Sequence, residues 1–201
     1  MRIILSDFMS LDGVVQAPGG PDEDRDGDFA HGGWSMPLFD SEAMGAAIDE
    51  VMKRSDALLF GRRTWEVMAA EWPKNAGDPF ADQMNAIPKY VASHTLSAKE
   101  ASLRWNNTTL LGGGGDAIEA IRSLRKSGGD GGVQMWGSAS LARQLVELDL
   151  VDEYCLMIEP ILLGGGKSIF PADRKARRLE LVSVQPAKTG VLICSYRPVR
   201  G

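Results

Sequence analysis

The sequence predicts an α/β protein with a mixed central sheet. Apolar segments of strand length alternate with segments of helical periodicity through the middle of the chain, which is typical of parallel βαβ units. Both ends are rich in strands, and the last two, residues 179–184 and 190–198, are close enough in sequence to form a C-terminal antiparallel strand pair. Because no repeat or linker interrupts the 201 residues, we expect a single domain over residues 1–201.

The first quarter of the chain contains a strand, a long loop and a helix. Residues 2–8 have the pattern of a strand, and residues 10–13 (SLDG) that of a turn. The loop over residues 16–33 is rich in Gly, Pro and Asp, and a loop of that length in a compact domain is usually functional or mobile. A helix is expected from Ser41 to about Arg54, where these apolar residues recur on one side: Met44, Ile48, Val51 and Met52.

The remaining elements follow in alternation. Strands are expected at residues 57–60, 89–93, 108–111, 133–136 and 151–163. A short helix is expected over residues 65–70, and a second begins after Asp116, whose carboxylate would cap it, and is broken by the glycines at 128–132. A third helix follows Ser140, because Leu141, Leu145 and Leu148 repeat at helical spacing.

The amino-acid composition and net charge restrict the kinds of ligand and partner that are expected. The chain is 44% hydrophobic and 24% charged, which is ordinary for a soluble globular protein, and its formal net charge is −5. We find no basic patch, so nucleic acid is not an expected partner. No apolar run approaches membrane-spanning length, and the N-terminus lacks the apolar core of a signal peptide, so a cytoplasmic protein is expected. An anionic ligand would have to be held by local positive groups and backbone N–H.

Metal chemistry is not expected. The two histidines, His31 and His94, are far apart, and no spacing typical of a metal site occurs. Cys155 and Cys194 each lie in an apolar run, which favours buried free thiols, with a disulfide left open.

Three glycine-rich junctions are candidates for binding a phosphate. In VQMWGSASLARQL, four small residues lie where a strand turns into a helix: Gly137, Ser138, Ala139 and Ser140. They form either a tight turn with a serine cap or a seat for an anion at the helix N-terminus. In GRRTW, two arginines open a helix directly after a buried strand, either as a phosphate site or as solvated surface residues. The third, the glycines at 112–115, fits the dinucleotide pattern but is better explained as a flexible turn.

A fourth glycine run, GGGKS at residues 164–168, is not a P-loop. The required first glycine is replaced by Ile161, and Pro171 prevents a following helix. A tight turn is the simplest interpretation, and a wall of a ligand pocket is the alternative.

Taken together, these segments resemble the dihydrofolate reductase-like family. LLFGRRTWE and VQMWGSASLARQL resemble two strand-to-helix junctions of that fold. ILSDFMSLDGVV and DLVDEYCLMIEPILLGGGKSIF look like blocks of the reductase half of bacterial riboflavin-pathway deaminase-reductases and their stand-alone relatives. The match covers nearly the whole chain and is weakest in the loop over residues 16–33.

The resemblance implies a mixed central sheet of about eight strands flanked by helices, with NADPH as cofactor. Carried over residue by residue, Gly61, Arg62, Arg63 and Thr64 would hold the adenosine phosphates. Ser93 and His94 would lie near the 2′-phosphate. The pyrophosphate would be seated by the N-terminus of the later helix, at Gly137, Ser138, Ala139 and Ser140.

The sequence also departs from dihydrofolate reductases. Their helix before the GRRTW motif carries a carboxylate that faces the pterin, and the corresponding position here is near Gly45. Their later strand carries a threonine that contacts this acid, and this chain has Ile158 at that position. Their pair of glycines corresponds here to Gly137-Ser138, which is one glycine short. A substrate related to folate rather than folate itself is therefore expected. The deaminase half needs a zinc site that this sequence lacks.

The sequence gives fewer indications of the residues that would bind the substrate. Asp12 is a candidate proton donor because it follows the first strand at the ligand end of the sheet, and a simple Asp-Gly turn is its alternative. His31, Trp34 and Asp40 are candidates to line the substrate site, although Trp34 is equally well explained as an anchor of the loop.

Two functions follow. The first is an NADPH-dependent reductase that transfers hydride to a small heterocycle (pterin- or pyrimidine-like) or to a carbonyl or imine. The second is a non-catalytic nucleotide- or ligand-binding protein that keeps the reductase fold, which the missing carboxylate favours. A homodimer is expected from the apolar C-terminal strands and from the habit of the family.

Overall fold

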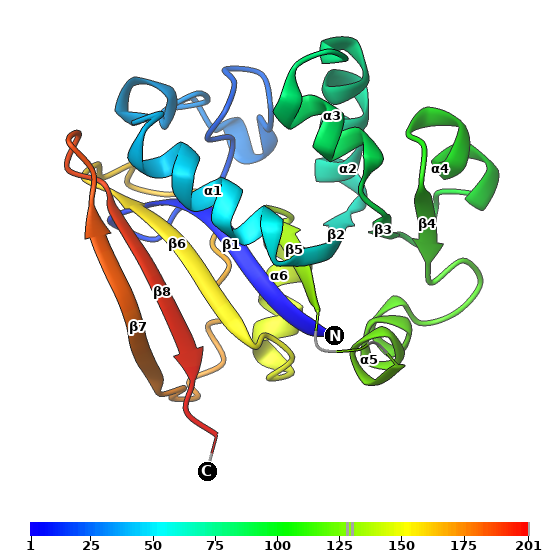
Figure 1. Ribbon diagram of the computed structural model, residues 1–201. Helices are drawn as coiled ribbons and strands as arrows, with labels where there is room; N and C mark the ends of the chain where they lie inside the picture. The colour runs from blue at the N-terminus through cyan, green and yellow to red at the C-terminus, as the bar shows by residue number, and fades with distance from the viewer. Residues whose placement is uncertain (128, 130, 201) are drawn as a thin grey trace.

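A computed structural model describes residues 1–127, 129 and 131–200. Its centre is an eight-stranded sheet of order β4-β3-β2-β5-β1-β6-β8-β7 (Figure 1). The strands are β1 (Arg2–Ser10), β2 (Ser55–Gly61), β3 (Lys89–Ala92), β4 (Thr108–Leu111), β5 (Gly132–Trp136), β6 (Glu153–Glu159), β7 (Leu179–Pro186) and β8 (Leu192–Pro198). The strands from β4 to β6 in this order are parallel, whereas β8 is antiparallel to both β6 and β7. The mixed sheet and the antiparallel C-terminal pair are thus confirmed.

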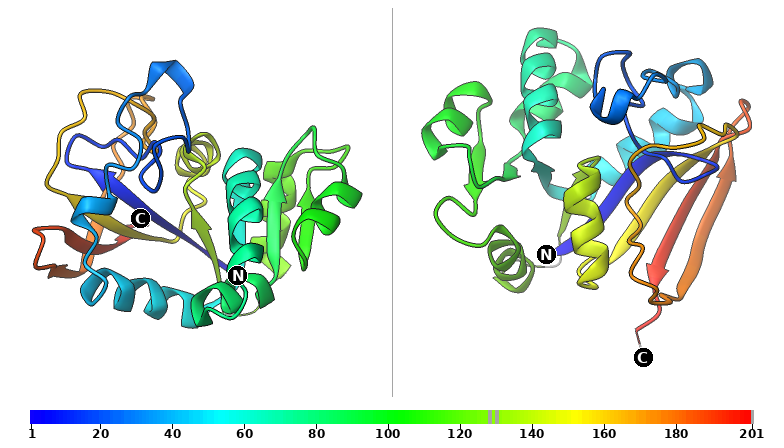
Figure 2. Two further views of the ribbon diagram at one scale, coloured as in Figure 1. Left: turned by 90° about the horizontal axis from the view of Figure 1, so that it is seen from above. Right: turned by 180° about the vertical axis from the view of Figure 1, so that it is seen from behind.

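Helices cover both faces of the sheet, and α1 and α6 lie on opposite faces (Figure 2). They are α1 (Ala43–Lys53), α2 (Arg62–Glu71), α3 (Pro79–Ala86), α4 (Ala98–Arg104), α5 (Ala117–Ser127) and α6 (Ala139–Glu147). Short 3-10 helices lie at Asp26–Asp28, Met36–Leu38 and Trp72–Asn75. Within the described residues, no helix is both long and apolar enough to cross a bilayer.

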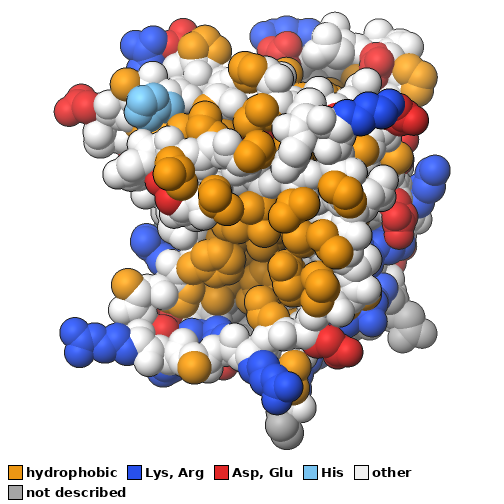
Figure 3. Space-filling model, turned by 90° about the vertical axis from the view of Figure 1, so that its left-hand side faces the viewer, with side chains coloured by type: hydrophobic (Ala, Val, Ile, Leu, Met, Phe, Trp, Pro, Cys, Tyr) orange, Lys and Arg blue, Asp and Glu red, His pale blue; other side chains and the backbone are white. Residues whose placement is uncertain are grey.

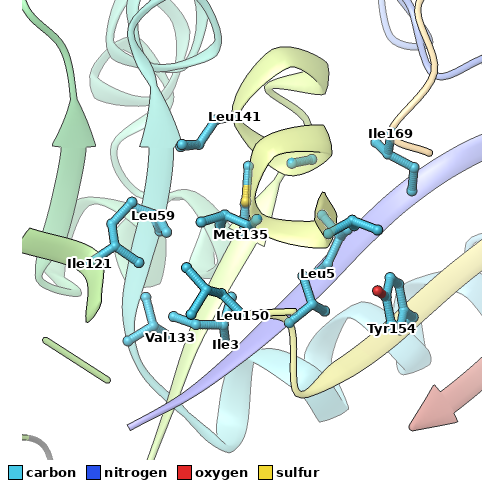
Figure 4. Close-up of a cluster of buried hydrophobic side chains, with 14 of the residues drawn as sticks. Ile3, Leu5, Leu59, Ile121, Val133, Met135, Leu141, Leu150, Tyr154 and Ile169 are labelled. Atoms are coloured by element: carbon cyan, nitrogen blue, oxygen red, sulfur yellow. The ribbon is translucent and has the colours of Figure 1, made fainter. Parts of the chain in front are cut away.

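The central strands are buried on both faces, which explains their continuous apolar runs. On the α6 face, Ile3 and Leu5 of β1 pack with Val133 and Met135 of β5, below Leu141 of α6 (Figure 4). On the other face, a second cluster joins α1 to α4 through aromatic and methionine side chains: Met52, Phe60, Trp65, Met84 and Trp105. The periodicity of α1 is confirmed, because Met44, Val51 and Met52 are buried.

The structure differs from the sequence prediction in the end of one strand and in two additional helices. The expected strand over residues 151–163 ends at Glu159, because Pro160 has no N–H to continue the ladder. Helices α3 and α4 were not predicted from the sequence. They have only 8 and 7 residues and are fixed by their caps, Asp78 and the Ser97–Glu100 capping box. The predicted glycine break at 128–132 includes residues 128 and 130, which lie outside the described part of the chain.

The β7 edge of the sheet leaves apolar residues in solvent. Leu181, Val182 and Val184 of β7 are about half exposed (51%, 46% and 51%), as is Leu192 of β8 (42%). Viewed from the β7 side, the surface is hollowed and lined by hydrophobic side chains (Figure 3). An edge strand with unpaired backbone groups and exposed apolar side chains is a common site of association.

Candidate functional site

A cleft of about 1950 Å³ lies at the carboxyl ends of the parallel strands. Its walls come from the ends of β1, β2, β3 and β5, from the loop over residues 15–26, and from α1 and the first turns of α2 and α6. In open α/β sheets, ligands bind in the crevice outside the carboxyl ends of the strands. This cleft is therefore the candidate site.

The first turn of α2 forms one wall. The buried strand β2 ends at Gly61, which is extended (φ −77°, ψ 163°), and the helix starts at Arg62. Thr64 lies inside the helix, and the N-cap residue is Gly61. A side chain at Gly61 would bring its Cβ to 3.1 Å from the Cβ and Oγ of Ser138, so a larger residue would push Ser138 away and glycine suits this close approach.

The first turn of α6 faces the first turn of α2. Gly137 and Ser138 are both left-handed, with φ of 56° and 60°, and Ser138 makes no side-chain cap to its own helix. Instead, the Ser138 Oγ accepts a hydrogen bond from the Gly61 N–H at 2.7 Å. Ser138 therefore does not form the serine cap that the sequence suggested. The small residues here allow the two strand-to-helix junctions to approach each other closely.

Two helices thus begin at the cleft without a side-chain cap. Neither α2 nor α6 has one. By contrast, α3 and α4 are capped by Asp78 and Ser97, and Asp116 accepts from Ile118 N at the start of α5, as predicted. Free N–H groups and the partial positive charge at a helix N-terminus favour an anion. A phosphate-bearing cofactor therefore fits the residues present.

Polar groups of β3 and α2 meet beside these helix starts. The Arg62 guanidinium donates to Glu66 Oε1 at 2.9 Å and also to Thr95 Oγ1. The Ser93 Oγ accepts from the N–H of Thr95 and Leu96 at 3.2 and 3.0 Å, which shapes the turn after β3. All ten predicted cofactor residues line this one cleft: Gly61, Arg62, Arg63, Thr64, Ser93, His94, Gly137, Ser138, Ala139 and Ser140.

The long loop over residues 16–33 lies against the cleft and is tied down by salt bridges. Arg63 binds Asp26 of this loop, and Lys167 binds both Asp24 and Asp26. The Lys167 backbone also contacts the loop, since its N–H donates to Gln16 Oε1 at 3.1 Å. Lys167 belongs to the GGGKS segment and lines the cleft, in agreement with the pocket-wall alternative for that segment.

Three polar side chains at the cleft have buried atoms without a partner: Asp7 Oδ2, Gln134 Oε1 and Trp136 Nε1. Asp7 is 8% exposed and Gln134 1% exposed. Burial raises the pKa of Asp7 well above its usual value, and the negative charge of Glu23 raises it further. The sequence prediction missed these residues. A polar residue inside an otherwise apolar strand, as in IILSDFM and VQMW, is the signal that points to them.

The four residues predicted for the substrate side do not line the cleft. Asp12 is exposed and binds the backbone N–H of Leu163 and Gly164 at 3.2 and 2.7 Å, and hydrogen bonds from Ser10 and from these N–H groups lower its pKa. It therefore ties the segment after β1 to the backbone at residues 163–164 and takes no part in the cleft lining. The Trp34 Nε1 donates to Gln16 O at 2.8 Å, which anchors the loop.

The other two of these residues also have local roles. Asp40 accepts from the N–H of Ala43 and of Lys188, at the start of α1 and near the end of β7. The ring of His31 packs edge-on against Phe29.

The position of the missing carboxylate does face the cleft. Gly45 of α1 lines it, and nothing lies within 4 Å of where its Cβ would be. Met157 lines the cleft rather than Ile158, which packs into the cluster on the α6 face. Among the described residues, no three His, Cys, Asp or Glu side chains group as metal ligands, and both cysteines are free.

The sheet order and the helices have a reductase-type fold, and the chain belongs to the RibD C-terminal domain family, whose sequence model matches residues 1–193. It is 27% identical to the uncharacterized protein YyaP of Bacillus subtilis over 200 residues, covering 97% of this chain and 94% of YyaP.

Solved structures share the fold. A putative riboflavin biosynthesis protein from Shewanella sp. PV-4 matches with a TM-score of 0.73 and 19% identity over 100% of both chains. A pyrimidine reductase-like protein from Corynebacterium diphtheriae matches with a TM-score of 0.60 and 14% identity, covering 100% of this chain and 92% of its own. RibD of Acinetobacter baumannii matches with a TM-score of 0.64 and 15% identity, covering 99% of this chain and 58% of the RibD chain.

Proposed function

We propose that this protein is an NADPH-dependent reductase of a small heterocyclic, carbonyl or imine substrate. The observation that carries the proposal is the meeting of two uncapped helix N-termini, those of α2 and α6, with Arg62 and Arg63 in one cleft. This combination suits a ligand with several phosphates, since backbone N–H groups and arginines bind phosphate oxygens together.

Different residues along the cleft would bind different parts of the cofactor. The N–H groups at the start of α6 would hold the pyrophosphate, and the turn at Ser93 and His94 with Arg62 would hold the 2′-phosphate. NADPH, when bound, supplies the hydride, and the protein supplies placement and the exclusion of water. The loop over residues 16–33 would cover the cofactor, because its Asp26 already contacts Arg63.

The proposal is tested by titrating the protein with NADPH and NADH while following fluorescence, and by measuring NADPH oxidation across pterins, pyrimidines, cyclic imines and small carbonyls. We expect NADPH to bind more tightly than NADH, and at least one compound to be reduced. Absence of NADPH binding at millimolar concentration would contradict the cofactor assignment.

A non-catalytic ligand-binding protein is the second candidate, and the empty position at Gly45 favours it. The same panel separates the two functions: a binding protein would bind NADPH and oxidise it with none of the compounds. We further propose that the protein acts on a small molecule in the cytoplasm, without nucleic acid or membrane partners, and forms a homodimer.

A further inference from the structure

Asp7 is the one buried carboxyl group among the residues that line the cleft. It lies near the end of β1, is 8% exposed, and its Oδ2 has no hydrogen-bond partner in the described structure. Buried polar groups in folded proteins are almost always satisfied, so an orphaned carboxyl oxygen beside a cleft needs a physical explanation, of which a catalytic role is one.

The surroundings of Asp7 favour its neutral form. The loop that faces it carries Glu23, Asp24, Arg25 and Asp26, and the flanking strand β6 carries Glu153 and Glu159, whereas the described residues of β5 bear no charge. Glu23 is the charge that acts on Asp7, and it acts together with burial to raise the pKa. A neutral carboxyl donates one hydrogen bond and carries one transferable proton.

Reduction of a C=N or C=O bond needs a proton as well as a hydride, and every acidic residue of the cleft lining other than Asp7 is partly or fully exposed to solvent. The helix position that would carry an acid is Gly45. Glu42 and Asp49 of the α1 region line the cleft but are exposed to solvent, and Glu42 is paired with Lys188. Asp12 lies outside the cleft.

We propose that Asp7 is the proton donor of this reductase, and that its free carboxyl oxygen binds the nitrogen or oxygen atom of an uncharged imine or carbonyl substrate. The proposal rests on the function proposed above. As hydride forms the new C–H bond, the π electron pair of the C=N bond moves to nitrogen, and nitrogen takes the Asp7 proton. The carboxylate left behind then recovers a proton from solvent.

The charge of the cleft wall beside Asp7 narrows the substrate class further. Glu23, Asp24 and Asp26 lie on this wall, and the cations beside them, Arg25, Arg63 and Lys167, are each already paired with an aspartate of the loop. No cation on this wall is left over for a substrate phosphate among the described residues. The substrate side therefore suits a neutral ring without a phosphate group.

The protonation of Asp7 is tested by infrared spectroscopy of the whole protein, following the carbonyl stretch of a protonated carboxyl as pH rises. Glu159 is a second buried acid, so the measurement is made in the Glu159→Gln background. We expect a band at pH 7 that Asp7→Asn removes and that Glu23→Gln moves to a lower pH midpoint. Absence of the band at pH 7, or its persistence in Asp7→Asn, overturns the proposal without touching NADPH binding.

Proton donation is tested with the compound that oxidises NADPH fastest in the panel. We expect Asp7→Asn to lower kcat by about 10²- to 10⁴-fold, the range of general acid catalysis, with the Kd of NADPH unchanged. Asp7→Glu should recover part of the rate, and the fall in wild-type kcat at high pH should disappear in Asp7→Asn. A kcat of Asp7→Asn within twofold of the parent overturns the donor role, whereas loss of NADPH binding in the parent overturns the proposed function itself.

Discussion

The Ser138 hydroxyl accepts a hydrogen bond from the Gly61 N–H at 2.7 Å, although the two residues are 77 positions apart. The bond joins the first turns of α2 and α6, the two helices that start at the cleft without side-chain caps. It fixes the spacing between two sets of N–H groups that a diphosphate would contact together. This contact between two glycine-containing junctions therefore contributes to the geometry of the candidate cofactor site.

Ser138→Ala is expected to reduce NADPH affinity modestly and to leave the fold intact. It removes the acceptor of a partly buried N–H, a loss of about 1 kcal/mol. Ser138→Gly is the matched variant, because glycine suits the left-handed backbone at φ 60° and still lacks the hydroxyl. If the hydroxyl matters, both variants lose affinity in a fluorescence titration, whereas a loss in Ser138→Ala alone would assign the effect to the backbone.

Gly137→Val is expected to nearly abolish NADPH binding. Gly137 has φ 56°, which a β-branched residue adopts only with strain, and its Cβ would lie 3.4 Å from Thr64 Cγ2 at the start of α2. A melting curve of the unliganded variant separates local loss from unfolding. A variant that stays folded and binds NADPH like the parent would show that this stretch is only a turn.

Arg62→Ala is expected to weaken NADPH and to leave NADH nearly unchanged. Arg62 reaches the turn after β3 through Thr95, and a charge-assisted bond to the 2′-phosphate contributes about 1.5–3 kcal/mol, or roughly 10- to 150-fold in Kd. Arg104→Ala is the control, because Arg104 also pairs with Glu66 but does not line the cleft. Equal loss for the two cofactors would contradict this role.

Asp26→Asn is expected to tighten NADPH binding. Asp26 pairs with Arg63, so the cofactor phosphates and the loop compete for the same guanidinium. The pair is largely exposed, and we therefore expect only a several-fold change in Kd. Glu71→Gln, which breaks an exposed ion pair with Lys74 outside the cleft lining, should leave the affinity unchanged. Weaker binding in Asp26→Asn would mean that the loop supports the cofactor rather than competing with it.

The stability of the protein is expected to fall as pH rises from 4.5 to about 7. Glu159 is fully buried, its Oε1 accepts from Ser35 Oγ at 2.5 Å, and burial raises its pKa from 4.5 to about 7. The folded state thus holds the proton more tightly than the unfolded state, so the free energy of unfolding decreases between pH 4.5 and 7 and levels off above. Urea denaturation across this range should show the decrease, and Glu159→Gln should flatten it.

A homodimer formed through the β7 edge is expected from its exposed apolar side chains (Figure 3). A second copy is the expected occupant, because two edge strands can pair their free backbone groups and bury Leu181 and Val184 together. Light scattering at micromolar concentration should give twice the monomer mass for the parent and the monomer mass for Leu181→Lys/Val184→Lys. A monomeric parent would remove this prediction.

Local pattern was enough to predict the junctions that build the site. A buried strand followed by glycine and a helix is visible in LLFGRRTWE and VQMWGSASLARQL, and the Asp116 cap and the terminal strand pair follow from equally short segments. These features depend on neighbours in sequence, so periodicity and capping chemistry determine them. Helices α3 and α4 escaped prediction because eight and seven residues carry too little periodicity.

Only the tertiary structure decided which of these pieces meet. The sheet order places β5 between β1 and β2, and this order brings Ser138 to Gly61. The same packing pairs Asp26 with Arg63 and buries Asp7, while it leaves Asp12 in solvent. Of Asp7 and Asp12, only Asp12 was named from the sequence as a candidate, and Asp7 was missed. Whether each aspartate is buried depends on contacts with segments distant in the chain, which no local pattern specifies. Burial in turn sets the pKa of each carboxyl group.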